Sequence, residues 1–344
     1  MLKIRILQIY LFFLLILLSS CNTTPKETLV YTPMKIGILR FDQDFMNLKQ
    51  EQAAAQDSLW SQHYGAFYKD FVPNMLRIRG DSLRRLQQLK EVAVSPDFNA
   101  LSRAVAQTFP DLSAEEAALG DALGRLNAYF PDKQLPAYFI AFFSGFSVQI
   151  PVGEAYIGIG LDLFLGTDAP FYPALQTQIP RYISRRFTRE NMVPKVVEGL
   201  LKEHWFEEKS LEGTFLDHIL KQGKMMQLMK HALPKVPDSV LIGYTEAQMR
   251  WAETYEREVW NWFVHQELLY STDYMSFQKH LNEAPFTPEL GENNESAPKL
   301  GVFIGWKIIQ HYQKHHPDLS LSALMEHKNA QSLLKASRYK GEAY

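Results

Sequence analysis

The chain has 344 residues, of which 46% are hydrophobic and 22% charged, and its formal net charge at pH 7 is −2. This composition is typical of a globular protein and excludes disorder over most of the length. A nearly neutral chain without a basic stripe lacks the electrostatic footprint of a nucleic-acid binder, so we expect no nucleic-acid partner.

The N-terminus has the features of a bacterial lipoprotein signal. Two basic residues precede an apolar run over residues 9–18, which is too short to span the ~30 Å of bilayer hydrocarbon. The sequence LSSC that follows resembles a lipobox, in which small residues precede a cysteine that is acylated and becomes the new N-terminus. Cys21 is the only cysteine of the chain. We therefore predict a signal peptide over residues 1–20 and lipidation at Cys21.

Acylation at Cys21 also predicts where the protein resides. Two or three acyl chains attach a protein to a membrane almost permanently, so the lipid bilayer is an expected partner. Asn22 stands where inner-membrane lipoproteins of enteric bacteria have aspartate, which favours the outer membrane, with the protein facing the periplasm. Residues 21–33 have the polar composition of a short tether. Residues 34–344 are expected to form one globular domain.

Downstream of the tether, hydrophobic patterning predicts a strand over residues 34–41 and then a series of helices. Asp97 is predicted to cap one of these helices. Ser113 and Glu116 have the spacing of a capping box at the start of another. The helices are expected over residues 51–65, 66–79, 81–89, 97–107 and from 113 onward.

The most apolar stretch after the N-terminus, residues 135–166, predicts the central sheet. Ala137–Phe143 is continuously hydrophobic, which is the pattern of a strand buried on both faces. Shorter strands are expected over residues 147–151 and 155–160. Because helical patterns precede and follow this stretch, the sequence predicts a mainly helical α+β fold with helices packed around a small central sheet.

Three glycine-containing motifs lack the context that their chemistry requires. The GIG sequence at residues 158–160 lacks the third glycine of a dinucleotide fingerprint and precedes an apolar run. Residues 301–307 have the wrong spacing for a phosphate-binding loop, and the SG pair at residues 144–145 lacks the first glycine of a nucleophile elbow. We therefore predict no cofactor and no serine nucleophile.

Two pairs of possible metal ligands also lack a third member. Asp42 and Asp44 offer two carboxylates, but no further ligand follows at calcium-loop spacing, and we interpret Asp44 as a helix cap. His311 and His315 lie one helical turn apart, as zinc ligands do, without a recognisable third ligand. No metal site is predicted at either pair.

The helices expected over residues 178–187 and 190–205 carry the candidate ligand-binding residues. The basic residues of the first helix suit an anion, although charge on an exposed helix face is the commoner explanation. They are Arg181, Arg185 and Arg186, and Arg189 and Lys195 could join them. Glu198 in the second helix is a further candidate, because the helix after the sheet is where zinc peptidases carry their ligands. The chain contains no HExxH and no HxxEH sequence, so no catalytic residue is predicted.

The C-terminal third is expected to be helical. Thr245 and Gln248 form a capping box that predicts the start of a long helix with a broad aromatic face. Gly301 and Gly305 lie one turn apart in an apolar helix and permit close packing against a neighbouring helix. The tail from Ala336 is expected to be frayed.

Several segments together resemble the GldB-type gliding-motility lipoproteins. They are the lipobox, RFDQDF, YIGIGLDLFLG, IPRYISRRF, KQGKMM and GVFIGWKIIQHY, and they occur in the family's order over nearly all of the mature chain. The resemblance implies an outer-membrane lipoprotein needed for gliding and associated with the machinery that secretes surface adhesins. It also implies a degenerate zincin-like layout without metal ligands, and it carries over no catalytic residue.

Three hypotheses follow for the function. The first is a non-catalytic component or assembly factor that works with proteins of the gliding or secretion apparatus. The second is a divergent hydrolase that uses Glu198 or Glu203 as a base, with His204 or His218 nearby. The third is a binding module for an envelope polymer or a partner segment, through Arg181 and Arg185 or a groove beside the Trp251 helix.

Overall fold

The fold was analysed in a computed structural model, which describes residues 29–48, 53–78, 80, 82–206, 212–291 and 295–341. The described residues from Thr32 onward belong to one compact unit. The predicted signal peptide over residues 1–20 and the predicted lipidation site Cys21 lie outside the described residues. Within the described residues, no helix combines the length and the hydropathy that crossing a bilayer requires.

The elements confirm a mainly helical α+β fold with a small sheet. The strands are β1 (Ile38–Arg40), β2 (Tyr138–Phe142) and β3 (Tyr156–Gly160). The helices before the third strand are α2 (Phe41–Met46), α3 (Ala53–His63), α4 (Gly65–Asp70), α5 (Ser82–Val94), α6 (Pro96–Thr108) and α7 (Ser113–Tyr129). Those after it are α8 (Arg181–Ser184), α9 (Met192–Leu200), α10 (Phe215–Ala232), α11 (Asp238–Ile242), α12 (Glu246–Thr254), α13 (Glu256–His265), α14 (Tyr274–Phe277), α15 (Leu300–His315), α16 (Leu321–Glu326) and α17 (Ala330–Ser337). Shorter turns are π-helical at Phe71–Met75 and Leu201–Trp205, and 3-10 helical at Leu161–Leu163, Tyr172–Leu175, Arg189–Asn191, Leu268–Tyr270 and Gln278–His280.

The three strands form a parallel sheet in the order β1-β2-β3. The long apolar run predicted as a doubly buried strand is β2, and the run at residues 155–160 is β3, all of whose residues are buried. The strand expected over residues 147–151 is wrong. These residues form a loop that folds back along the outer edge of β3, where Gly158 N donates to Pro151 O at 2.8 Å and Gly160 N donates to Gln149 O at 2.9 Å.

A buried carboxylate fixes the turn that leaves β2. Asp162 accepts hydrogen bonds from Ser144 N at 2.8 Å, Ser144 Oγ at 2.9 Å and Phe146 N at 2.7 Å, and it has no exposed surface. Gly145 and Phe146 both have positive φ, so this turn bends the backbone into the left-handed region. The hydroxyl of Ser144 is therefore a hydrogen-bond donor that helps to hold this turn.

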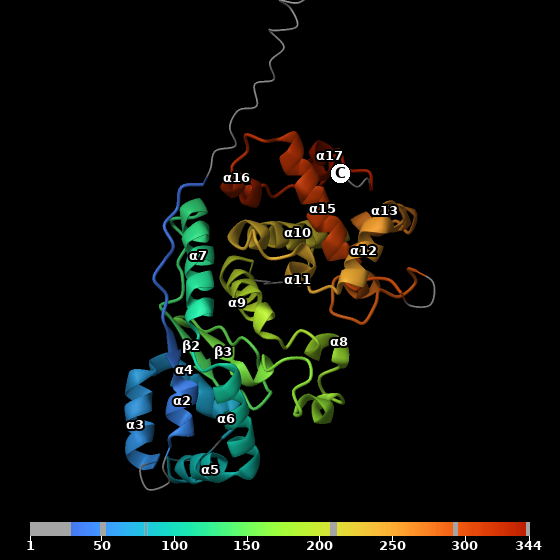
Figure 1. The fold of residues 1–344 in the computed structure, drawn as a ribbon. Coiled ribbons are helices and arrows are strands. Elements are labelled where there is room, and N and C mark those ends of the chain that lie inside the picture. The colour runs from blue at the N-terminus through green and yellow to red at the C-terminus, as the bar shows by residue number, and fades with distance from the viewer. Residues whose placement is uncertain are drawn as a thin grey trace, which may run out of the picture. The chain divides into compact units, whose positions relative to one another are not determined.

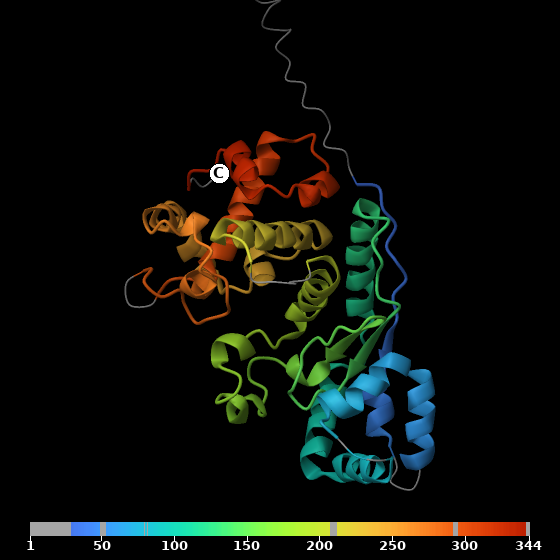
Figure 2. The same cartoon turned by 180° about the vertical axis from the view of Figure 1, so that it is seen from behind.

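The N-terminal helices pack around one aromatic side chain. Phe41 contacts Trp60, Tyr64 and Phe71 in edge-to-face arrangements, with ring centroids 4.9–5.2 Å apart. Helices α2 to α6 gather at the end of the unit away from α10 and α15 (Figures 1 and 2). The strand expected over residues 34–41 is shorter than predicted, because Phe41 already begins α2.

Helices α10 and α15 cross at close range in the C-terminal half (Figure 1). A Cβ atom added to Gly305 would overlap the carbonyl oxygen of Ile219, and one added to Gly223 would overlap the carbonyl oxygen of Gly305. The prediction that Gly305 permits close helix packing is therefore confirmed. The neighbouring Gly301 lies against Phe215 and the backbone of His280.

The tail expected to fray from Ala336 instead packs onto the fold, with alternate residues buried up to the last described residue. Ser337 and Tyr339 are buried, and the Tyr339 hydroxyl donates to Glu256 at 3.0 Å. That prediction was wrong because sequence position alone does not reveal that the end of the chain packs against α13 and α15.

Three helix caps can be compared with their predictions. Thr245 and Gln248 form the predicted capping box, but the helix ends after Thr254 and a second one starts at Glu256. Asp97 is not a cap, because the Ser95 hydroxyl accepts from Phe98 N at the start of α6.

The capping box predicted at the start of α7 is absent. The Ser113 hydroxyl donates to Asp111, and the Glu116 carboxylate instead accepts from the backbone N–H of Ile38, 2.8 Å away. Glu116 therefore joins α7 to the first residue of β1. A contact between residues so far apart in sequence outweighs the local spacing.

Candidate functional site

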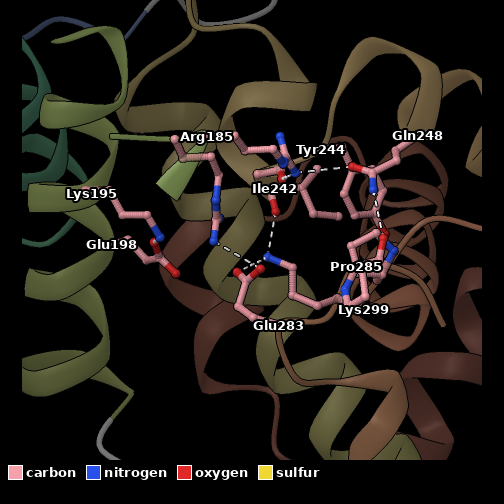
Figure 3. A network of polar contacts seen from close by, with 12 residues as sticks. Arg185, Lys195, Glu198, Ile242, Tyr244, Gln248, Glu283, Pro285 and Lys299 are labelled. Atoms are coloured by element: carbon pink, nitrogen blue, oxygen red, sulfur yellow. Dashed lines mark hydrogen bonds and ion pairs between the residues drawn. The ribbon is translucent and has the colours of Figure 1, made fainter. Parts of the chain in front are cut away.

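A cavity of about 260 Å³ lies between α9, α10, α11 and the segments that lead into α15. Its apolar wall includes three methionines of α10 together with Leu241 and Ile242 of α11. Its charged wall consists of Arg186, Lys195, Glu198, Lys202, Glu283 and Lys299. Both walls come from elements that are distant in sequence, and the polar network beside the cavity is drawn in Figure 3.

The first ion cluster of the cavity lies on α9 and its continuation. Lys195 precedes Glu198 by three residues and Lys202 follows it by four, so all three side chains share one helix face. Lys195 Nζ lies 2.7 Å from Glu198 Oε2, and Lys202 Nζ lies 2.6 Å from Glu198 Oε1. Both carboxylate oxygens of Glu198 are therefore engaged. The helix widens into a π-helical turn at Leu201–Trp205, a distortion that is frequent at functional sites.

The second ion cluster is assembled from three separate segments. Arg186 NH2 lies 3.0 Å from Glu283 Oε2, and Lys299 Nζ lies 2.6 Å from Glu283 Oε1. Lys299 also donates to Ile242 O at 2.7 Å. Lys299 has a left-handed backbone with φ of 51°, which is uncommon outside glycine. Residues in such conformations tend to cluster at functional sites.

The electrostatics of both carboxylates favour the ionised form. Burial raises the pKa of Glu198, but Lys195, Lys202 and Lys299 outweigh burial, so this pKa lies well below its ordinary value. Burial likewise raises the pKa of Glu283, but Lys299 and Arg186 bring it down to about 2. Glu198 is consequently a weak base at neutral pH, and both of its carboxylate oxygens already accept hydrogen bonds.

Burial also acts on the cations. It lowers the pKa of Lys299 to about 8, in spite of the opposing attraction of Glu283. Arg186 is only 7% exposed, and its Nε atom has no hydrogen-bond partner among the described residues. Four cationic side chains thus share two carboxylates, and the charged wall keeps an excess of positive charge.

The candidate ligand-binding residues from the sequence are only partly brought together. Glu198 lines the cavity, as described above. Arg185 lies in the adjoining polar network, where its NH2 atom donates to Gly243 O at 2.7 Å and to Gln248 Oε1 at 3.2 Å (Figure 3). Arg181, at the start of the short helix α8, is exposed and does not line the cavity.

Sequence reasoning named Arg186 and Lys195 as possible anion ligands, and both line the cavity. It missed three other charged residues of the cavity, namely Lys202, Glu283 and Lys299. The fold brings Arg186 against Gly243, where a Cβ atom would collide with the guanidinium and φ is +79°. No spacing in the sequence shows which of these segments meet.

A comparison with protein families assigns the chain. The model of the family described as "Gliding motility protein GldB" matches residues 22–341. The chain belongs to the GldB family. No curated protein and no solved structure matches it. The resemblance found in the sequence is therefore confirmed, and the whole cavity lies within the matched range.

In this GldB-family chain, the residues of the hydrolase hypothesis are distributed over different places. Glu203 lines a neighbouring cavity of about 380 Å³ together with Glu198. His204 lines another cavity, of about 500 Å³, beside Lys224. His218 packs against the rings of Tyr274 and Phe277. The described residues therefore do not place either imidazole in a cavity with Glu198.

The possible metal ligands have other roles in the described structure. Asp42 forms a two-point ion pair with Arg40. Asp44 lies inside α2, where its carboxylate accepts a hydrogen bond from the Tyr64 hydroxyl. The interpretation of Asp44 as a helix cap was therefore wrong. The rings of His311 and His315 stack 6.4 Å apart. Across the described ranges, no three side chains of His, Cys, Asp or Glu gather as a metal site.

Proposed function

We propose that this GldB-family protein is an envelope lipoprotein, anchored through acylated Cys21, that serves as a non-catalytic component or assembly factor of the gliding and adhesin secretion machinery. The family match over residues 22–341 carries the proposal. It begins at the residue after Cys21, which is consistent with a mature chain that starts at an acylated cysteine. We place the protein at the outer membrane, facing the periplasm.

The anchor is tested by substitution of the cysteine. In a gliding host, Cys21→Ala should remove acylation, measured by incorporation of an alkyne fatty acid, and should move the protein out of the membrane fraction. Ser20→Ala is the matched control, because it keeps a small residue before the cysteine and should leave acylation unchanged. A Cys21→Ala protein that still carries label would contradict the anchor.

The role in motility is tested by gene deletion. The deletion strain should lose gliding on agar and should display less adhesin at its surface, and the wild-type gene should restore both. Normal gliding and normal adhesin display in the deletion strain would reject the proposed role.

The non-catalytic part of the proposal has a separate test. The ion-paired state of Glu198 makes this residue a poor general base, as argued above. The purified full chain should therefore cleave neither casein nor a peptide library and should retain no zinc after dialysis. Turnover that disappears in Glu203→Gln or Glu198→Gln would establish the hydrolase instead.

A further inference from the structure

The charged wall of the cavity has more positive than negative side chains. Arg186, Lys195, Lys202 and Lys299 carry four positive charges, whereas Glu198 and Glu283 carry two negative ones. The side chains of Arg186 and Lys299 are 9% and 11% exposed, whereas that of Lys202 is 50% exposed, so the cost of uncompensated charge falls mainly on the two buried cations. An anion in the cavity would remove the excess of two positive charges.

The hydrogen-bond donors of this wall also exceed its acceptors. Each glutamate already accepts from two cations, whereas a lysine ammonium has three N–H donors and a guanidinium has five. The buried Nε of Arg186 lacks a partner among the described residues. Oxygen atoms of a ligand would accept hydrogen bonds from the N–H groups that the two carboxylates do not engage.

The excess of two charges selects among anions. A phosphate monoester carries about −1.5 to −2 charges at pH 7 and has three strong acceptor oxygens. Arginine and lysine together are well suited to such a group, the guanidinium by paired hydrogen bonds and the ammonium as a compact charge. A single carboxylate would leave one positive charge uncompensated.

The apolar lining of the cavity indicates what a bound phosphoryl group would be attached to. Met225, Met226 and Met229 of α10 line the same cavity together with Leu241 and Ile242. Methionine adapts to irregular apolar shapes. At about 260 Å³ the cavity lies just below the ~300–1,000 Å³ of common small-molecule sites, so its ligand is compact.

We infer that the cavity between α9, α10 and α11 binds a small phosphate dianion, either inorganic phosphate or the phosphoryl group of a compact monoester with an apolar part. Arg186, Lys195, Lys202 and Lys299 would hold the phosphoryl oxygens, and the methionine wall would contact the ester group. The inference is independent of the proposed role in gliding, because it concerns only the cavity and stands or falls on binding to the purified chain.

Calorimetric titration of the full chain in a neutral detergent at pH 7 tests the inference. The probes are inorganic phosphate, phenyl phosphate and dihexanoyl phosphatidic acid, with phenol and succinate as comparators. Phosphate or phenyl phosphate should bind, and phenol should not. The phosphate probe that binds with the highest affinity shows whether the natural ligand is free phosphate, a soluble monoester or a lipid headgroup. Absence of binding by all three, or binding of succinate alone, overturns the inference.

Charge variants show whether binding occurs in this cavity. Lys299→Met and Lys202→Met should each weaken binding about tenfold, since each removes one positive charge and its hydrogen-bond donors from the cavity. The Lys202 side chain is 50% exposed, so its variant keeps the test valid if Lys299→Met does not fold. Glu198→Gln should strengthen binding, because it releases two lysines for the ligand.

The matched control is Lys279→Met. Lys279 also pairs with a glutamate, Glu289, at 2.7 Å, but it lies outside the cavity. Its variant should bind phosphate as the wild type does. Binding that is unchanged in both cavity variants, or weakened equally in Lys279→Met, overturns the assignment to this cavity.

Discussion

His280 is a histidine with no exposed surface, enclosed by aromatic rings. The centroid of its ring lies 5.2 Å from that of Trp262 and 5.1 Å from that of Phe263. Neither ring nitrogen has a hydrogen-bond partner among the described residues. Burial, aided by Lys279 and opposed by Glu289, lowers the pKa of His280 to about 4. At neutral pH the folded protein therefore holds an uncharged imidazole.

This histidine should make folding sensitive to mild acid. The pKa of an unfolded histidine is near 6.5, so between pH 6.5 and about 4 the unfolded chain takes up a proton that the folded chain does not. The free energy of unfolding should fall over this interval by up to ~3 kcal/mol more in the wild type than in His280→Leu. Urea unfolding measured between pH 7.5 and 4 checks this difference.

The control for the acid effect is His265→Leu, since His265 is exposed on α13. Its pH dependence should follow that of the wild type. If the wild type and His280→Leu lose stability in parallel as the pH falls, the buried imidazole does not contribute to acid sensitivity.

At the scale of single residues, the sequence predicted the chemistry of the cavity only in part. Glu198 was identifiable from its place on the helix after the sheet. Glu283 and Lys299 follow no periodic pattern, and a lysine directly before an apolar helix is usually exposed. Their partnership depends on a fold that brings residues 283 and 299 against α9 and α11, and local spacing contains no information about that approach.

At the scale of elements, the crossing of α10 and α15 depends on glycine. Alanine favours a helix over glycine by ~1 kcal/mol, but a methyl group at Gly305 would meet the backbone of α10, which cannot rotate away. Gly305→Ala should therefore lower the free energy of unfolding by about 2 kcal/mol or more. Thermal and urea unfolding of the full chain measure the effect.

Gly37→Ala is the matched control for this crossing. Nothing lies within 4 Å of a Cβ atom built at Gly37, so its variant should change stability by no more than about 0.5 kcal/mol. Equal effects of the two substitutions would mean that the helices separate easily and that the crossing is not tight.

The elements that sequence patterns predicted well are those dominated by burial. The strand β2 is a continuous apolar run and the helix α15 begins with one, at residues 300–306, and such runs have few alternatives. The failures occurred where a polar side chain has a distant partner. Glu116 binds the backbone of β1 instead of capping α7, and no pattern within α7 reports that choice.

At the scale of the whole molecule, one hydrophobic cluster joins distant parts of the chain. It extends from Ile38 to Tyr339 and includes Leu333 of α17, which has no exposed surface. A continuous core of this kind should unfold in one step, so fluorescence and far-UV circular dichroism should give coincident transitions. Two separate transitions would contradict a shared core.

The same cluster predicts a long-range effect of a C-terminal substitution. Leu333→Ala should lower stability by roughly 2–5 kcal/mol, and hydrogen exchange should speed up in β2 as well as in α15. Leu83→Ala, at a side chain that is 80% exposed, is the control and should change little. Faster exchange confined to α15 and α17 would indicate that the C-terminal end unfolds alone.

The family and the fold class were predictable from the whole sequence, because many short segments and many apolar runs act together. The zincin-like layout stays a prediction, since no solved structure matches the chain. The burial of Tyr339 was not predicted, because a single aromatic residue near a terminus carries too little signal to distinguish packing from fraying.

The loop at residues 149–153 has a consequence for assembly. Sheet edges are common docking places, because a partner can extend the sheet by pairing its backbone with the outermost strand. Here the N–H groups of Gly158 and Gly160 already bond to the chain's own loop. A partner could add a strand directly beside β3 only by displacing that loop.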